Sequence, residues 1–306
     1  MEKITKQGFL SPFIKGTGLV IKNIKSFLIP ALISLPFSMG IGIFSLHQMT
    51  RASSLLDAII NGDTFAASTY IQNVFIPLSI TQLIEVLFFL LFSIVAFNLS
   101  QRGSNLLDKA FEVLVINIPR ILLLLLEILG AFFLTILANL IFVSVFSSVL
   151  IRAGLPDNII ILCVYIEFIV VYLLIGLLII FSPLNVLIMG YRPYQAIKAS
   201  IRLVGSSFFR FFLSFILLFF LAAFLNILIQ TPFLKPLSID FFSMLSGKAA
   251  NNIEYVLANP FYTFIYAIAS AFSFAIVVPF LSSVYIHLFL DILEVYARKH
   301  RGDKFS

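Results

Sequence analysis

Six long runs of apolar residues constrain the fold of this 306-residue chain more than any other feature. A helix crosses the hydrocarbon core of a bilayer with about 20 consecutive apolar residues. The runs that reach this length are Ile24–Phe44, Phe75–Leu99, Ile118–Leu150, Ile159–Gly190, Phe208–Gln230 and Phe261–Leu290. With 61% hydrophobic and 11% charged residues, the chain has too little polar surface to coat a soluble globule. The sequence therefore predicts an all-α, polytopic membrane helix bundle and excludes a soluble enzyme, a nucleic-acid-binding protein and a disordered chain.

Four prolines lie inside these runs: Pro30, Pro36, Pro183 and Pro279. A proline removes one backbone hydrogen bond, and its ring clashes with the preceding turn of a helix. Each of the four positions therefore predicts a kink.

The basic residues gather on one side of the predicted membrane. Sixteen of the 20 Lys and Arg residues fall in the N-terminal segment, in 100–120, in 190–210 and in the C-terminal segment, and four fall on the other side. Because cytoplasmic loops carry the excess of Lys and Arg, this asymmetry predicts that both termini are cytoplasmic. We expect a multi-pass membrane protein whose basic side faces the cytoplasm.

A displacement of 90 residues aligns the sequence with itself without gaps. Arg102 then falls on Arg192 and Arg120 on Arg210, and the apolar residues between them recur in steps of three and four, as on one face of a helix. A weaker copy of this basic amphipathic pattern precedes the first apolar run. The alternative is that any two amphipathic segments look alike; the coincident Arg pairs favour an internal repeat.

Each repeat consists of a basic amphipathic helix, a span, an outer loop and a second span. In the third copy, Ile197, Ile201 and Val204 form the apolar face, and Lys198 and Arg202 lie beside it. We expect six transmembrane helices in three parallel hairpin repeats, each preceded by a basic amphipathic interfacial helix. Residues 1–306 then form a single integral membrane domain, with repeats at approximately 8–100, 101–190 and 191–297 and a cytoplasmic tail at 298–306.

The basic residues around these helices are candidates for contact with anionic lipid headgroups. Each Lys or Arg near an anionic leaflet contributes about 1 kcal/mol to attachment, and the apolar face of such a helix lies in the headgroup boundary. The predicted contact residues are Lys15, Lys22, Lys25, Arg102, Arg120, Arg192, Lys198, Arg202 and Arg210.

Three acidic residues, Glu85, Glu127 and Glu167, lie deep inside the apolar runs. An acidic residue at the centre of a membrane helix costs about 2.5–3.5 kcal/mol on insertion scales, and no Lys or Arg lies at that depth to pair with it. One interpretation is a proton or cation relay, or a polar cavity for a lipid headgroup. The other is a neutral carboxyl group that joins two helices by a hydrogen bond to a polar neighbour such as Gln82.

His287, Asp291 and Glu294 share one helix face near the end of the last run. Three ligands on one helix rarely converge on a metal ion, so we expect contacts of the acids to Arg298 and to the basic interfacial helices instead. No P-loop, HExxH or G-x-S-x-G pattern occurs. We therefore expect no catalytic residues, no metal and no cofactor.

Small residues recur at every fourth position in two runs: Ser34, Ser38 and Gly42, and Ala267, Ala271 and Ala275. Such ridges let helices approach closely. We expect them to serve internal packing, and a homodimer interface is the alternative.

The segment 183–220 resembles a known pattern. A proline at 183 is followed by YRPYQAIKASIRLV (191–204) and by the aromatic-basic entry FFR (208–210) to the next run. This order is similar to that in the membrane domain of bacterial glycerophosphoryl diester phosphodiesterases and in their stand-alone inner-membrane relatives. The resemblance implies a six-span module of the bacterial cytoplasmic (inner) membrane. It implies no hydrolase activity, because the phosphodiesterase catalytic domain has no counterpart in the chain.

These features predict a non-enzymatic integral membrane protein that interacts with membrane lipids or with a partner protein of the cell envelope. The alternative is a transporter or lipid-translocating protein with a polar path lined by Glu85, Glu127 and Glu167. A cavity that reaches these acids favours the alternative, whereas a solid bundle favours the first interpretation. Nothing in the sequence indicates nucleic acid as a partner.

Overall fold

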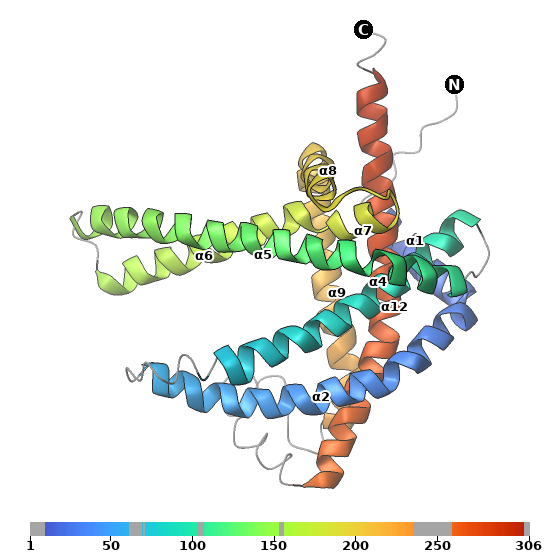
Figure 1. The fold of residues 1–306 in the computed structure, drawn as a ribbon, viewed down its shortest axis with the longest axis horizontal. Helices are drawn as coiled ribbons and strands as arrows, with labels where there is room; N and C mark the ends of the chain where they lie inside the picture. Colours follow the sequence, from blue (N-terminus) through green and yellow to red (C-terminus); the bar gives the residue numbers. More distant parts are fainter. Residues whose placement is uncertain are drawn as a thin grey trace. The chain divides into compact units, whose positions relative to one another are not determined.

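The computed structural model describes residues 10–60, 69, 71–102, 107–152, 156–234 and 259–302, and every element in these ranges is a helix (Figure 1). The elements are α1 (Ser11–Lys22), α2 (Ile24–Ile60), the short π-helix η1 (Ile71–Phe75), α4 (Ile76–Arg102), α5 (Leu107–Arg152), α6 (Asp157–Ile179), α7 (Ser182–Leu187), α8 (Pro193–Ser206), α9 (Phe208–Leu234) and α12 (Pro260–Gly302).

Six helical stretches are long and apolar enough to cross a membrane. They are Ile24–Gln48, Gln72–Gln101, Lys109–Phe146, Val170–Leu187, Phe208–Phe233 and Pro260–Arg298. Their length and composition are those of a multi-pass membrane protein. The predicted all-helical fold is therefore confirmed for the described residues, and so are six spans as judged by helix length and composition.

The fourth predicted run differs from the structure, because it is not one continuous helix. The helix α6 ends at Ile179, and Pro183 lies in the first turn of the separate helix α7, where a missing backbone N–H is tolerated. Gly190 then takes a φ of 68°, a left-handed conformation that glycine adopts without strain, before α8 begins. The proline at 183 therefore breaks the run instead of kinking it. Pro30, Pro36 and Pro279 lie inside continuing helices.

Two of the three expected basic helices are separate elements. The helix α1 ends before α2, where the Asn23 side-chain amide donates to the backbone oxygen of Leu19 at 3.0 Å, and α8 ends before α9. By contrast, α5 continues without a break from Leu107 to Arg152. The basic segment before the third span therefore belongs to the same helix as that span.

The chain divides into two compact units that are described separately. Unit 1 comprises Met1–Ala110 and Leu213–Leu288, and unit 2 comprises Phe111–Phe212 and Phe289–Ser306.

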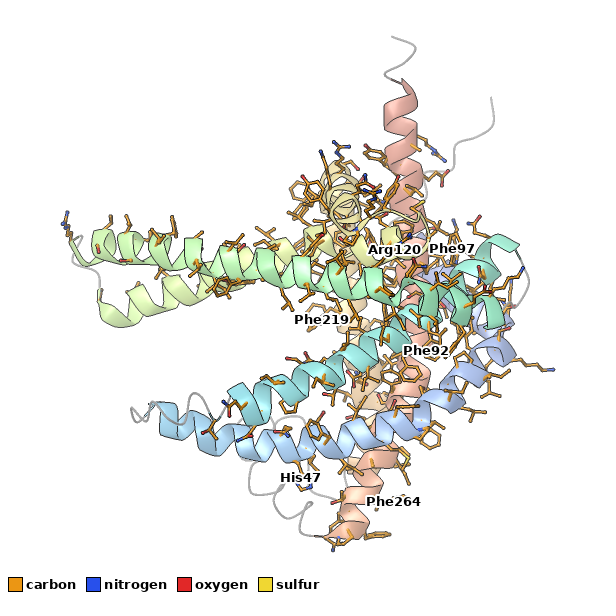
Figure 2. All side chains as sticks on the ribbon, viewed as in Figure 1. His47, Phe92, Phe97, Arg120, Phe219 and Phe264 are labelled. Atoms are coloured by element: carbon orange, nitrogen blue, oxygen red, sulfur yellow. The ribbon has the colours of Figure 1, made fainter. Side chains whose placement is uncertain are left out.

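Aromatic stacking and a close helix approach hold unit 1 together. Phe92 of α4, labelled in Figure 2, is fully buried, and its ring stacks on Phe27 of α2 with the centroids 6.5 Å apart. The helix α1 approaches α12 so closely that a Cβ atom at Gly16 would lie 2.8 Å from the Val284 backbone. Only glycine allows this approach at position 16.

The two ridges of small residues lie inside unit 1, and all their members except Ala275 are buried. A Cβ atom at Gly42 would lie 2.9 Å from the Ser270 hydroxyl oxygen, so α2 and α12 meet at this point. Ser34 and Ser38 on α2, and Ala267 and Ala271 on α12, are also buried. The internal-packing interpretation is confirmed for these residues.

In unit 2, α8 covers the break between α6 and α7. The Ser200 hydroxyl donates to the backbone oxygen of Leu178 at 2.7 Å and accepts the backbone N–H of Phe181 at 3.1 Å. The Asn185 side-chain amide donates to the backbone oxygen of Ala196 at 3.2 Å. The two bonds of Ser200 satisfy backbone groups that the break releases, and the bond of Asn185 joins α7 to α8.

Candidate functional site

Four helices of unit 1 line a cavity of about 570 Å³, which we call the polar cavity. Its walls come from α2, α4, α9 and α12. The polar side chains among the lining residues are Ser38, Gln82, Glu85, Asn226, Gln230, Ser270 and Ser273.

On α4 and α12 the polar cavity lies well inside the candidate spans, whereas Gln230 of α9 is three residues from Phe233, the end of its span. Glu85 is 13 residues from Gln72 at the start of its span, and Ser273 is 13 residues from Pro260. At a rise of 1.5 Å per residue, both lie about 20 Å along their helices. A polar group at such a depth requires a hydrogen-bond partner, water or a ligand.

Helical spacing brings the polar side chains to the same cavity. On α4, Gln82 and Glu85 are three residues apart, and on α9, Asn226 and Gln230 are four residues apart. Residues at these spacings lie on the same face of a helix. Each helix therefore presents a polar patch on one face of an otherwise apolar span.

Two hydrogen bonds orient polar groups in the wall. Ser38 donates its hydroxyl hydrogen to the backbone oxygen of Ser34 at 2.9 Å, which leaves the oxygen lone pairs of Ser38 as acceptors. Ser273 of α12 donates to the side-chain oxygen of Asn226 on α9. The second bond joins the two helices at the level of the cavity.

The remaining wall is apolar, and one side is open. Phe89, Phe274 and Leu281 are among the apolar lining residues. Gln82 and Asn226 are exposed although they line the cavity. The cavity is therefore accessible from the exterior of unit 1.

The described residues of the cavity wall can carry negative charge but no positive charge. Among the described residues that line it, Glu85 is the ionisable residue, and none is Lys, Arg or His. An ionised carboxylate in this position attracts a cation, and its interaction is stronger than in water because the surroundings are largely apolar.

Glu127 and Glu167 belong to unit 2 and do not line the polar cavity. The rings of Phe132 on α5 and Tyr172 on α6 stack with centroids 5.9 Å apart, which sets the register of this antiparallel pair (Figure 1). In that register Glu167 lies level with Leu137, about 15 Å along the helix from Glu127. The structure therefore does not bring these two acids together.

One carboxyl oxygen of each of these two residues, Oε2, is buried and has no hydrogen-bond partner in the described part of the chain. That Glu127 and Glu167 join helices as neutral carboxyl groups stays a prediction.

The acidic face of α12 forms ion pairs. Glu294 pairs with Arg298 one turn along the helix, which confirms the predicted contact. Asp291 pairs with Arg210 of α9, with 2.7 Å between Oδ2 and Nη2. Within the described ranges, no group of three His, Cys, Asp or Glu side chains is placed to hold a metal ion.

The predicted lipid-contact residues differ in their surroundings. Arg210 is engaged by Asp291, and the side chain of Arg102 lies outside the described residues. The exposed side chains are those of Lys15, Lys22, Lys25, Arg120, Arg192, Lys198 and Arg202. Arg202 also lines a smaller cavity of about 140 Å³ in unit 2.

On α8 the docked face coincides only in part with the predicted apolar face. Val204 of the predicted face is buried together with Ala196, Ser200 and Leu203, whereas Ile201 of the predicted face is 42% exposed. The helix thus presents an apolar side chain beside the exposed Lys198 and Arg202.

Comparison with protein-family models, with curated proteins and with solved structures found no match to this chain. The resemblance of segment 183–220 therefore stays a prediction.

Sequence reasoning identified Glu85 and Gln82 as candidates but missed Asn226, Gln230 and Ser273. Asn226 and Gln230 leave a signal in the sequence, because they are polar residues four apart in an apolar run. That run contains no acidic residue, so the criterion of an acid at membrane depth does not identify them.

Proposed function

We propose that the protein is a non-enzymatic multi-pass membrane protein that binds a polar solute or lipid headgroup in the polar cavity and moves it across or within the bilayer. The single observation that carries this proposal is the position of Glu85, an acid at membrane depth in the wall of a cavity of about 570 Å³. Ligand pockets in proteins commonly have volumes of about 300–1,000 Å³. This proposal is the transporter alternative of the sequence analysis. Of the intramembrane candidates named there, it keeps Glu85 and Gln82.

The cavity gives a physical reason for retaining a carboxyl group in an apolar span. A carboxylate that faces water or a polar ligand avoids most of the cost of burial in hydrocarbon. The side opening at Gln82 and Asn226 supplies a route for a ligand.

A cysteine-accessibility experiment tests this proposal. The sole native cysteine is removed by Cys163→Ala, and single cysteines are introduced by Gln82→Cys and, as a matched control, by Ile80→Cys. Ile80 lies two residues away on α4, is 56% exposed and does not line the cavity. Because a thiolate forms in water and not in hydrocarbon, a charged methanethiosulfonate reagent should modify Gln82→Cys at least about tenfold faster. Equal rates at the two positions contradict a polar, accessible cavity.

A second candidate function is attachment to anionic lipid through α1 and α8, and the exposed side chains of these helices favour it. On α1, Ile14 and Ile21 are exposed beside Lys15 and Lys22. An apolar group beside a basic group matches the boundary between acyl chains and anionic headgroups. In this proposal the basic side faces the cytoplasm of a bacterial inner membrane, and α1 and α8 are the amphipathic helices of the first and third of three parallel repeats.

Native mass spectrometry tests the lipid contact. The double variant Lys198→Ala/Arg202→Ala should retain fewer anionic lipids than the wild type, and retention of zwitterionic lipid should not change. The matched control is Lys109→Ala, because Lys109 is an exposed basic residue outside the predicted contact set. An equal loss in the control and the double variant contradicts a specific role of α8.

A further inference from the structure

The chemistry of the polar cavity carries an inference about its ligand, and this inference rests on the function proposed above. We propose that the cavity binds an organic primary ammonium group: a cationic nitrogen with N–H donors, attached to a short hydrocarbon part.

The charge of the wall determines the sign of the charge on the ligand. Glu85 is the ionisable residue among the lining side chains that the structure describes, and Lys, Arg and His do not occur among them. An anionic ligand would meet a carboxylate without a compensating cation, whereas a cation is attracted to it. The ligand is therefore a cation.

The hydrogen-bonding groups of the wall select a cation that donates. Ser38 presents oxygen lone pairs because its hydrogen is bonded to the Ser34 backbone. Gln82 and Gln230, whose side-chain amides each carry an acceptor oxygen and two N–H donors, line the same cavity as the carboxylate of Glu85. A primary ammonium has three N–H donors for such acceptors, and a quaternary ammonium has none.

The size and the apolar part of the wall exclude a bare ion. Metal ions bind where several oxygens converge at about 2.0–2.6 Å, and a cavity of about 570 Å³ is far larger than such a site. Phe89, Phe274 and Val277 also line the cavity, beside the polar groups. Aromatic rings attract cations, and the aliphatic side chains bury hydrocarbon. The wall therefore fits an ammonium group with an attached apolar chain.

Two sources supply this chemistry, a free amine and the headgroup of an aminophospholipid. Because the cavity is open at its side, both can reach it. The experiment below separates them.

Isothermal titration calorimetry of the full-length protein in phosphatidylcholine nanodiscs tests the ligand class. The probes are n-butylammonium, butyltrimethylammonium, 1-butanol and butyrate, which share one hydrocarbon part. We expect n-butylammonium to bind at least about tenfold more tightly than each of the others, as a charge-assisted hydrogen bond requires. Repeating the titration in nanodiscs that contain phosphatidylethanolamine distinguishes the sources: competition by this lipid supports a headgroup, and its absence supports a free amine.

Two variants localise the binding. The substitution Glu85→Gln keeps the size of the side chain and removes its charge, so it should weaken n-butylammonium binding by about tenfold or more. The matched control, Glu112→Gln, removes an exposed acid of unit 2 that does not line the cavity, and it should leave binding unchanged.

Different results overturn different statements. Equal affinity for butyltrimethylammonium overturns the requirement for N–H donors, and equal affinity for butanol or butyrate overturns the requirement for a cation. If no probe binds while Gln82→Cys is still modified faster than Ile80→Cys, the ammonium inference is wrong and the proposed accessible cavity stands. If the two cysteines react equally, the proposed function itself is wrong.

Discussion

The contact between α1 and α12 at Gly16 allows a sharp test of how the first helix is held. In the substitution Gly16→Ala, the new Cβ atom would lie 2.8 Å from both the Cα and the N atom of Val284 and 2.9 Å from its Cγ2 atom. Ordinary contacts of a Cβ atom begin at 3.4 Å, so α1 has to move away by about 0.6 Å, and two of the three close atoms are backbone atoms that cannot rotate aside.

The free-energy change caused by Gly16→Ala is the sum of two opposing effects. Overpacking of this kind costs about 1–3 kcal/mol, and replacing a glycine inside a helix by alanine stabilises the helix by up to about 1 kcal/mol. Gly18→Ala is the matched control, because Gly18 lies inside the same helix and a Cβ atom there meets nothing within 4 Å. The propensity gain is the same in both variants. The difference between them is therefore the packing cost alone, about 1–3 kcal/mol.

Hydrogen exchange of the α1 amides, measured by mass spectrometry in detergent micelles, reads out this difference. A helix of 12 residues is marginal when it is not docked, so loss of docking exposes its amides. At 1.36 kcal/mol per factor of ten, α1 in Gly16→Ala should exchange about 5- to 160-fold faster than in Gly18→Ala. Equal exchange in the two variants refutes the close approach. Adding Val284→Ala to Gly16→Ala should restore protection only in part, because it removes the Cγ2 contact and leaves the backbone contacts.

Other contacts support further predictions. Gly42→Ala should weaken n-butylammonium binding in the calorimetric assay, because its Cβ atom displaces a hydroxyl group of the cavity wall, and Gly40→Ala should not, because a Cβ atom there meets nothing within 4 Å. Arg210→Leu should destabilise the fold by about 3 kcal/mol in thermal unfolding, because it removes the cation from a carboxylate whose side chain is 6% exposed; Arg210→Leu with Asp291→Leu should cost less. Ser200→Ala should cost about 1–3 kcal/mol in the same assay, because one buried backbone donor and one acceptor lose their partner, and a wild-type melting temperature would contradict this.

The spans were predictable because they depend on length and apolarity alone, and these properties are local to the sequence. The break before Pro183 was predicted only as a kink. Whether a proline bends a helix or ends it depends on whether other groups satisfy the released backbone, and here Ser200, at a distance along the chain, accepts the N–H of Phe181. Such a contact leaves no periodic pattern in the sequence.

The positions of Glu85 and Glu127 inside spans were also predictable, but not which of them faces a cavity. For Glu167 the predicted depth was wrong, because the fourth candidate span begins only at Val170. Glu85 and Glu127 both lie inside apolar runs, and only Glu85 lines the polar cavity. Depth follows from counting residues along a helix, whereas the direction of a side chain depends on the rotation of that helix about its axis. Rotation is determined by packing against neighbouring helices, which a single sequence does not specify.

The ridges of small residues link packing to the site. Ser38 belongs to the ridge of α2 and also lines the polar cavity, and Ser270 contacts Gly42 in that ridge and lines the cavity from α12. A close approach at Gly42 therefore orients α2 and α12 so that their serines point to the same space, into which α4 brings Glu85. The glycine that permits the approach thus contributes to the site without touching a ligand, because it determines the rotation of the helices that carry the polar groups.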